Sequence, residues 1–275
     1  MTLQQATDII SLQRRLGSFV PTYPPDILTY LVNVSTLNGN VIKKVVDALV
    51  VFDDYVRVNN LRQYIHLLSI MCTENINGAF VPLYYPVGYP GVIVTALGSY
   101  VYTRTGGLVG NTASWINTQI PFNAVNSINQ GMMAIQALNT AVDSGGEMGV
   151  SISGVSNNLQ SRFTDGNSYA RHLGATVTVA NASATGFYVA LRSTSTDLRL
   201  YKDGTQSGST STTLATGTGL GTTNISVHAL AGAGSISATR AIGGYVIGSS
   251  TPMPQGSIAG FSTAWATLNT VIRTP

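Results

Sequence analysis

The apolar residues between Phe80 and Ile247 form short runs that are separated by turn residues. The clearest example is residues 186–208, GFYVALRSTSTDLRLYKDGTQSG, in which aromatic and β-branched residues from Phe187 to Arg192 favour a half-buried strand. After a polar break, residues 198–202 alternate between the two sides of a pleat, and Asp203-Gly204 is typical of a two-residue hairpin turn. The pattern predicts two neighbouring antiparallel strands at the centre of an all-β sandwich.

Other segments of the chain predict further strands of this sandwich. Residues 61–72 predict an entering strand, in which His66 is expected to be a hydrogen-bonded core residue, with a ligand or catalytic role as the alternative. Asp165-Gly166 predicts a second hairpin turn. Residues 205–223 are almost all Ser, Thr and Gly, so we expect a flexible segment or an exposed loop that lies on a neighbour. The remaining strands are predicted at 148–153, 159–163, 168–173, 176–179, 224–230, 236–240 and 243–247.

Helical periodicity is confined to the two ends of the chain. Residues 2–16 predict a short helix that carries the apolar residues Leu3, Ala6, Ile9, Ile10, Leu12 and Leu16. A proline-rich joint, which contains Pro21, Pro24 and Pro25, separates this helix from the rest. Leu3, Ile9, Ile10 and Leu16 are therefore the candidate residues for docking on another subunit, and packing on the chain's own domain is the equal alternative.

Three more helices are predicted. The first two cover residues 25–34 and 41–56, and the β-branched residues leave a strand within 45–52 as an alternative. The last covers residues 255–272 and places Ile258, Phe261, Trp265, Leu268 and Ile272 on one face. We expect this face to cover an edge or end of the sandwich, with contact to a neighbouring subunit as the alternative.

The fold class that follows is mainly β, a sandwich with short N-terminal helices and one C-terminal helix. We divide the 275 residues into a docking arm at 1–23, a helical lead-in at 24–58, a β-sandwich at 59–252 and a C-terminal helix at 253–275. Residues 129–139, which include GMMAIQALN, have the composition of a helix, and the pattern alone does not decide between helix and strand.

Composition narrows the function classes. Only 9% of the residues are charged, against about 25% in a typical soluble domain, and the polar residues are mostly uncharged. Weak charge repulsion suits a protein that is packed into an assembly. The net charge is +3, and the short basic pairs Arg14-Arg15 and Lys43-Lys44 do not predict nucleic-acid binding. The single cysteine, Cys72, lies in an apolar run and is expected to be buried and inert. No secretory signal and no membrane span of about 18 apolar residues is expected.

A family resemblance adds to this picture. FYVALRS, a short spacer and LRLYKDG resemble the paired strands of concanavalin A-like (laminin G-like) jelly-roll modules in structural proteins of tailed bacteriophages. Arg192 at the end of the first strand and Tyr201 to Gly204 at the end of the second carry the match, because strand pattern alone would not require them. Further matching pieces occur in the same order at 46–55, 64–86, 144–154 and 238–250. The resemblance implies a concanavalin A-like jelly roll over roughly residues 24–275 and a strand of the inner sheet at 129–139.

Candidate chemistry is sparse. A glycosidase needs two carboxylates across a sugar-sized gap, but Glu74 and Glu147 are the only glutamates and stand singly in the sequence. His172 and His228 have no evident acid partner for a serine hydrolase, and no nucleophile elbow is present. The histidines are spaced too widely for a zinc site. We therefore expect no catalytic residues, no metal site and no cofactor, with a structural calcium ion held by loop carbonyls and an aspartate as an open alternative.

The predicted function is that of a non-catalytic structural protein of a bacteriophage virion, in the tail, a fibre or a capsid-attached part. The expected partners are other virion proteins and further copies of the chain, with a host surface glycan as a further partner. Aromatic platforms would bind such a glycan, and the candidates are Tyr100, Tyr102, Trp115, Tyr169 and Tyr201. The alternative is a glycan-active enzyme or a free lectin on the same jelly roll.

Overall fold

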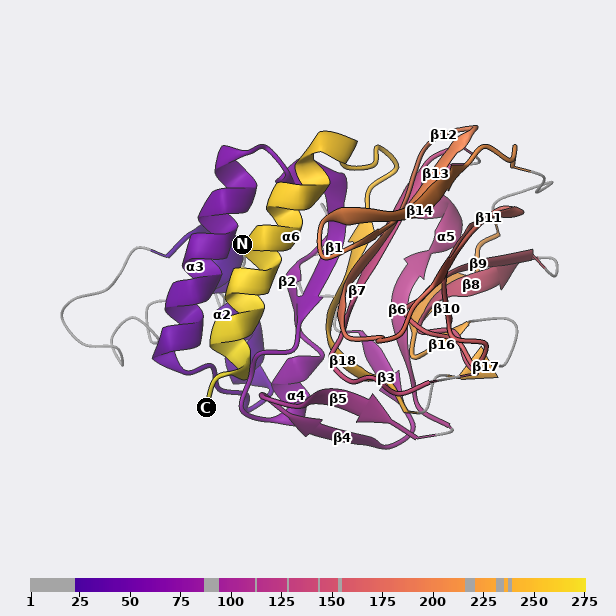
Figure 1. Ribbon diagram of the computed structural model, residues 1–275. Coiled ribbons are helices and arrows are strands. Elements are labelled where there is room, and N and C mark those ends of the chain that lie inside the picture. The colour runs from indigo at the N-terminus through magenta and orange to yellow at the C-terminus, as the bar shows by residue number, and fades with distance from the viewer. Residues whose placement is uncertain are drawn as a thin grey trace.

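The computed structural model describes residues 23–86, 94–111, 113–127, 129–142, 144–152, 155–215, 221–230, 235–236 and 239–275. Within them the chain forms three layers, which are a layer of helices, a nine-stranded sheet A and a seven-stranded sheet B (Figure 1). All strand pairs are antiparallel. The fold class predicted from the sequence, a mainly β sandwich with short N-terminal helices and a C-terminal helix, is confirmed.

The elements follow the chain in this way. The helices are α2 (Pro25–Thr36), α3 (Lys43–Val58), α4 (Ile76–Ala79), α5 (Phe122–Val125) and α6 (Gln255–Arg273), and a 3-10 turn spans Arg62–Tyr64. Sheet A has the order β14 (Thr205–Ser211), β13 (Asp197–Lys202), β12 (Gly186–Thr194), β7 (Gly131–Ala137), β18 (Ala241–Gly248), β1 (Ile65–Ile70) and β2 (Pro82–Tyr84), with β5 (Gly107–Gly110) on β18 and β4 (Tyr100–Thr103) on β5. Sheet B has the order β11 (Ala175–Ala180), β10 (Asn167–His172), β9 (Val155–Gln160), β8 (Met148–Ile152), β15 (Asn224–Val227), β6 (Trp115–Pro121) and β3 (Thr95–Leu97). A small hairpin joins β16 (Ala229–Leu230) to β17 (Ser235–Ile236).

The central strands of sheet A are buried on both faces, which explains the sequence of β7. In β7, Met132 and Ala134 belong to the core under the helices, whereas Met133 and Ile135 belong to the core between the two sheets. All seven residues of β7 are buried. A strand covered on both faces has no reason to alternate between apolar and polar residues, so residues 129–139 look like a helix in composition. The strand that the resemblance implied there runs from Gly131 to Ala137.

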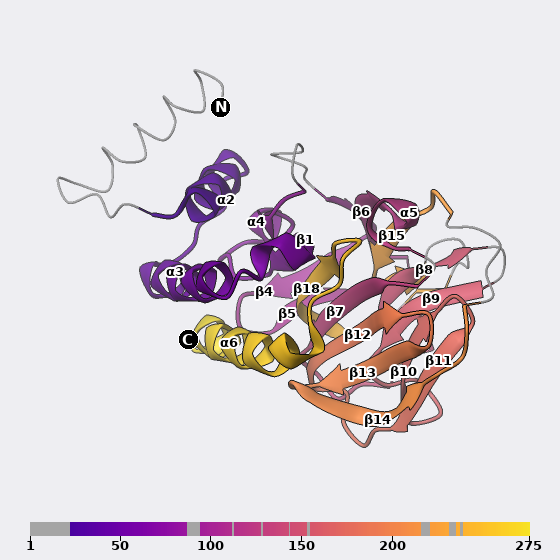
Figure 2. The same cartoon turned by 90° about the horizontal axis from the view of Figure 1, so that it is seen from above.

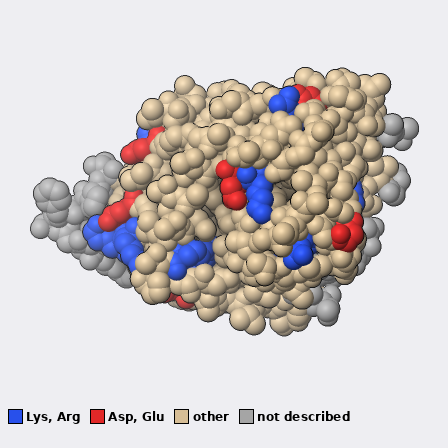
Figure 3. Space-filling model, in the orientation of Figure 1, with Lys and Arg blue, Asp and Glu red and all other residues tan. Residues whose placement is uncertain are grey.

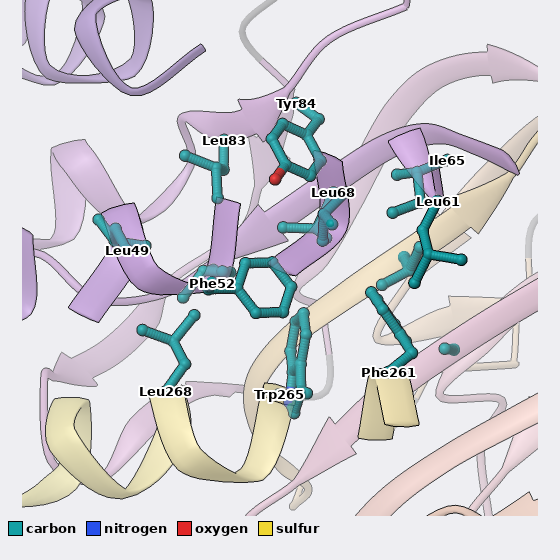
Figure 4. Packing of buried hydrophobic residues seen from close by; sticks show 14 of the residues in the cluster. Leu49, Phe52, Leu61, Ile65, Leu68, Leu83, Tyr84, Phe261, Trp265 and Leu268 are labelled. Carbon is teal, nitrogen blue, oxygen red and sulfur yellow. The ribbon is translucent and has the colours of Figure 1, made fainter. Parts of the chain in front are cut away.

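The helical layer covers sheet A through aromatic packing. Helices α3 and α6 lie side by side against the sheet (Figure 1), Phe52 of α3 faces Phe261 and Trp265 of α6 (Figure 4), and α6 contacts β12. The Trp265 ring stacks on Phe187 at 4.7 Å between ring centres, and Phe52 meets Trp265 edge-on at 6.0 Å. The predicted apolar face of the C-terminal helix is buried, and it covers a face of sheet A rather than an edge or end of the sandwich. The segment 45–52 lies within helix α3, because its apolar side chains can be buried on one side and flanked by α6.

The central hairpin has the turn that the sequence predicted, and the buried Arg192 connects it to neighbouring loops. Asp203 and Gly204 both have positive φ, 50° and 83°, as a two-residue turn between twisted strands requires. Arg192 is fully buried and donates hydrogen bonds to the carbonyl oxygens of Ser195 and Thr213, so it ties two loops together. The residues that carry the family resemblance thus have structural roles here.

Several predicted boundaries are wrong. Residues 205–211 form the edge strand β14 rather than a loop, because backbone pairing with β13 needs no apolar side chains. The strand predicted at 159–163 runs instead from Val155 to Gln160, since the turn that reverses the chain already begins after it. The strand predicted at 236–240 is limited in the described residues to a two-residue pairing. The short helices α4 and α5 were not predicted, and Asn75 caps α4 by accepting from Gly78 N at 3.1 Å.

Candidate functional site on the outer face of sheet B

The outer face of sheet B carries a row of polar residues that crosses every strand. Cross-strand pairing places seven residues side by side, namely Thr95, Asn117, Ser226, Gly149, Asn158, Arg171 and Thr176. The opposite face of the same strands supplies apolar residues to the core between the sheets. This alternation explains the strands of sheet B, because each has one face in the core and one face outside.

The row is open at its two ends, where Thr95 on β3 is exposed at one end and β10 and β11 carry the other. Ser226 and Asn158 in its middle are buried, whereas Thr176 and Thr178 on β11 are exposed and Arg171 on β10 is half-buried. The accessible polar surface therefore lies on β10 and β11, at one edge of the sandwich (Figure 2). We call the group formed by Asn158, Gln160, Asp165, Tyr169 and Arg171 the Arg171 cluster.

The Arg171 guanidinium group is held in place by side chains behind it. Its Nη1 donates to Gln160 Oε1 at 3.0 Å and lies 3.5 Å from Asn158 Oδ1. Both amides are buried, with exposed fractions of 4% and 1%, so their positions are fixed by packing. Among the described residues, Nε and Nη2 of Arg171 have no hydrogen-bond partner, so two groups of donors remain for a ligand.

An aromatic ring lies under the same guanidinium group. The centre of the Tyr169 ring is 4.1 Å from Arg171 Cζ, which is the geometry of a cation–π contact. Phe163 meets this ring edge-on at 6.0 Å. The Tyr169 hydroxyl donates to Asp165 Oδ2, and Asp165 Oδ1 accepts from Asn167 N at 2.9 Å in the turn between β9 and β10. The predicted Asp165-Gly166 turn therefore also orients the aromatic ring.

The charges of the cluster are consistent with these contacts. The hydrogen bond from Tyr169 lowers the pKa of the Asp165 carboxyl and raises that of the Tyr169 phenol. Burial lowers the pKa of Arg171, while Tyr169 and Asp165 act in the opposite direction. An arginine with an ordinary pKa above about 12 remains a cation at neutral pH. The cluster thus presents one fixed positive charge, one negative charge beside it and a phenol ring.

The other aromatic residue on this face is Trp115. It lies half-buried on β6, across from the exposed Leu97 on β3, at the far end of the sheet. Its strand neighbour Asn117 accepts from Asn224 Nδ2 at 3.0 Å, and Gln119 Nε2 donates to Thr95 Oγ1 at 3.0 Å. Four strand spacings separate β6 from β10, about 19 Å, so Trp115 and Tyr169 do not form one site.

The remaining predicted aromatic residues lie elsewhere. Tyr100 packs between Phe80 and His228, with ring centres at 5.7 and 5.6 Å, and burial raises the pKa of its phenol. The Tyr102 hydroxyl donates to Thr73 O at 2.7 Å. Tyr201 is buried in the core under the helices, so its ring offers no surface to a sugar. The five candidates therefore lie in four places, because only Tyr100 and Tyr102 share a strand.

The acidic residues considered for catalysis hold the fold together. Glu147 is buried and accepts from Arg240 Nε at 2.8 Å, and Glu74 accepts from Arg104 Nε at 2.6 Å. His66 is half-buried on β1, and burial lowers the pKa of its imidazole. Within the described residues, no group of three potential metal ligands from His, Cys, Asp and Glu occurs. The candidate assembly residues Leu3, Ile9, Ile10 and Leu16 lie outside the described residues.

Sequence reasoning found Tyr169 and missed the residues around it. The signal was present in the alternation of β10, because Asn167, Tyr169 and Arg171 occupy every second position and share one face. Asn158 and Gln160 show the same spacing on β9. Their contact with Arg171 depends on the pairing of β9 with β10, which a local pattern does not give.

Comparisons with known proteins support the fold. No protein-family model and no curated protein matches the chain. Among solved structures, a sialidase from Trypanosoma rangeli in complex with sialic acid superposes with a TM-score of 0.52 and 11% identity over 80% of this chain and 39% of that chain. Domain 4 of an extracellular arabinanase from Geobacillus stearothermophilus, in complex with arabinotriose, gives a TM-score of 0.48 and 11% identity over 72% of this chain and 99% of that domain. The chain spans about two fifths of the sialidase. At such low sequence identity, the superposition shows a shared β-sandwich fold alone.

Among the residues described, none of the helices combines the length and the apolar character that crossing a lipid bilayer requires.

Proposed function

We propose that the chain is a non-catalytic, carbohydrate-binding β-sandwich module that forms part of a bacteriophage particle, and that the Arg171 cluster contacts the sugar. The observation that carries the binding role is the Arg171 guanidinium, which lies on the Tyr169 ring, is braced by two buried amides and keeps free donors at the surface. A preformed donor group of this kind loses little conformational entropy on binding.

The chemistry of the cluster favours an acidic sugar. A guanidinium group matches a carboxylate with two parallel hydrogen bonds, which an uncharged sugar cannot offer. Tyr169 and Phe163 supply apolar surface for the ring carbons of the sugar, and the exposed Thr176 and Thr178 supply hydroxyls beside it. A sialidase solved with sialic acid shares the fold, which supports carbohydrate as the ligand class. The proposed ligand is a polysaccharide that contains uronic or sialic acids.

The particle role has a separate basis. It is supported by the resemblance of residues 187–204 to phage structural modules and by the low charge of the chain. One face of the protein shows a few small groups of charged residues on a largely uncharged surface (Figure 3). Such a surface can be packed against neighbours without the desolvation of many charges. Other virion proteins and further copies of this chain are the proposed partners, and the virion is the proposed location.

The binding proposal is tested by calorimetric titration with an acidic polysaccharide and with the same polymer after its carboxylates have been reduced to alcohols. We expect binding of the acidic polymer alone, and Arg171→Gln is expected to weaken it by tenfold or more. Arg199→Gln is the matched control, because Arg199 is a partly exposed arginine on sheet A that pairs with Asp197. Equal binding by the two variants would reject the Arg171 cluster, and the absence of binding to any polysaccharide would reject the function.

The particle role is tested by quantitative mass spectrometry of purified particles before and after a high-salt wash. A constant, stoichiometric amount of the protein supports a structural component. Loss in the wash, or absence from the particles, would contradict it. An assay for reducing ends released from the bound polysaccharide separates this proposal from a glycan-active enzyme, because a binding module releases none.

A further inference from the structure

The outer surface of the helical layer contains an apolar groove between α3 and α6. The groove has a volume of about 470 Å³, and its walls include Ala48, Val51, Phe52 and Tyr55 of α3 and Leu268 and Val271 of α6. Val51 is 66% exposed at its wall. All the residues that line the groove belong to α3 and α6, so none of the described strands contributes to its walls. An open apolar groove between two helices fits a third amphipathic helix.

We infer that this groove is filled by the chain's own N-terminal segment, residues 2–16, which docks as a helix between α3 and α6. The segment carries an apolar stripe with Leu3, Ile9, Ile10 and Leu16 and precedes the described residues. A helix of 15 residues is about 22 Å long, and the α3 wall from Lys44 to Tyr55 extends over about 16 Å. The segment is therefore long enough to cover the groove from end to end.

The segment can reach the groove from the point where the described chain begins. Tyr23 packs against the core under the helices and lies close enough to Lys43 to act on its ammonium group electrostatically. Lys43 is next to Lys44 at one end of the groove. The six residues from Gly17 to Thr22 span at most about 20 Å when extended, which suffices to cross the first turn of α3. Entry at this end would place Leu16 near Lys44 and Leu3 near Tyr55.

The tether favours the chain's own segment over that of a second copy. A short linker gives a docking segment an effective local concentration in the millimolar range, far above ordinary protein concentrations.

This inference is independent of the proposed carbohydrate binding, because the Arg171 cluster lies on sheet B, at the other side of the molecule from the helices (Figure 2).

Disulfide trapping tests the occupant of the groove. In the double variant Ile9→Cys with Val51→Cys, mild oxidation is expected to give a disulfide within one chain, because Ile9 is placed near the middle of the groove. Ile9→Cys with Val58→Cys is the control, since Val58 is an exposed valine on the same helix that does not line the groove. A product of dimer mass would show that a second copy fills the groove and would overturn the inference, as would equal trapping in both variants.

A second measurement does not depend on the register of the helix. Val51→Asp places a charge in the groove and is expected to release the segment, so that trypsin cleaves after Arg14 and Arg15 at least several times faster than in the unchanged protein. Val58→Asp adds the same charge outside the groove and is expected to leave the rate unchanged. Cleavage at one rate in all three proteins would overturn the inference.

Discussion

Glu147 and Arg240 form an ion pair in which both side chains are buried, with Arg240 Nε 2.8 Å from Glu147 Oε1. The exposed fraction is 1% for the Glu147 side chain and 0% for that of Arg240. Glu147 immediately precedes β8 of sheet B, and Arg240 immediately precedes β18 of sheet A. Ser161 completes the site, because its backbone N and its hydroxyl both donate to the Glu147 carboxylate. The pair therefore joins the two sheets at one end of the sandwich.

Removal of the negative charge should destabilise the protein strongly. In Glu147→Gln the Arg240 cation stays buried without its counter-charge, so we expect the free energy of unfolding to fall by about 3–5 kcal/mol. The measurement is urea denaturation at neutral pH. Lys43→Gln is the control, because it breaks an exposed ion pair with Asp47, and water screens such a pair so that its loss should change stability little. Similar losses in the two variants would show that the buried pair does not stabilise the join.

The two tryptophans should respond differently to truncation. Trp265 stacks on Phe187 and donates from Nε1 to Gln136 Oε1 at 3.0 Å in the core under the helices. Trp265→Ala is expected to cost about 3–5 kcal/mol of unfolding free energy because it leaves a cavity and an unpaired amide. Trp115→Ala, at the half-buried edge of sheet B, should cost clearly less. Equal costs in thermal or urea unfolding would contradict the packing described for α6.

Stability should decrease with rising pH above about pH 9 because of Cys72. Burial raises the pKa of this thiol to about 11 from an ordinary value near 9.0, and its Sγ lies 3.0 Å from the Tyr30 hydroxyl. Above pH 9 the unfolded chain releases the thiol proton while the native chain retains it, so the contribution is complete below pH 9 and is lost as pH approaches 11. Cys72→Ala should flatten the decline between pH 9 and 10. An unchanged slope would contradict this assignment.

A glycine in β18 should not tolerate a methyl group. A Cβ at Gly244 would lie 2.6 Å from Ser69 O and 2.9 Å from Trp265 Cζ2, so the strand, the neighbouring strand β1 or the α6 side chain would have to move. Gly244→Ala is expected to lower the unfolding free energy by about 1–3 kcal/mol or more. Gly256→Ala, in the first turn of α6 with nothing within 4 Å, should be neutral or stabilising by up to about 1 kcal/mol. A stable Gly244→Ala protein would show that β18 and α6 are less tightly packed.

Local sequence patterns predicted what local physics determines. The Asp203-Gly204 turn follows from backbone sterics, and the apolar face of α6 follows from helical spacing. The path of residues 205–211 was not predictable, because Ser and Thr side chains do not distinguish an edge strand from a loop and the decision lies in pairing with β13. Tyr201 looked accessible since its strand alternates, yet sheet A is covered on its second face by helices.

The candidate site shows the same division. Tyr169 could be selected as an aromatic residue in a predicted strand, but its partner Arg171 gains meaning only through the contact with its ring and with two amides from β9. Those contacts depend on strand register, which is set by the turn at residues 161–166 and by the core between the sheets. Sequence patterns therefore identified one member of the cluster and not the cluster.

The central strands of sheet A are buried on both faces, so they separate the outer face of sheet B from the helical layer. Substitutions that adapt the exposed strands of sheet B to a new ligand would leave the helices untouched, because a doubly covered sheet stands between them. The same holds in the other direction for changes in α3 or α6. Such an arrangement makes the protein a suitable scaffold for grafting new binding strands onto an unchanged base.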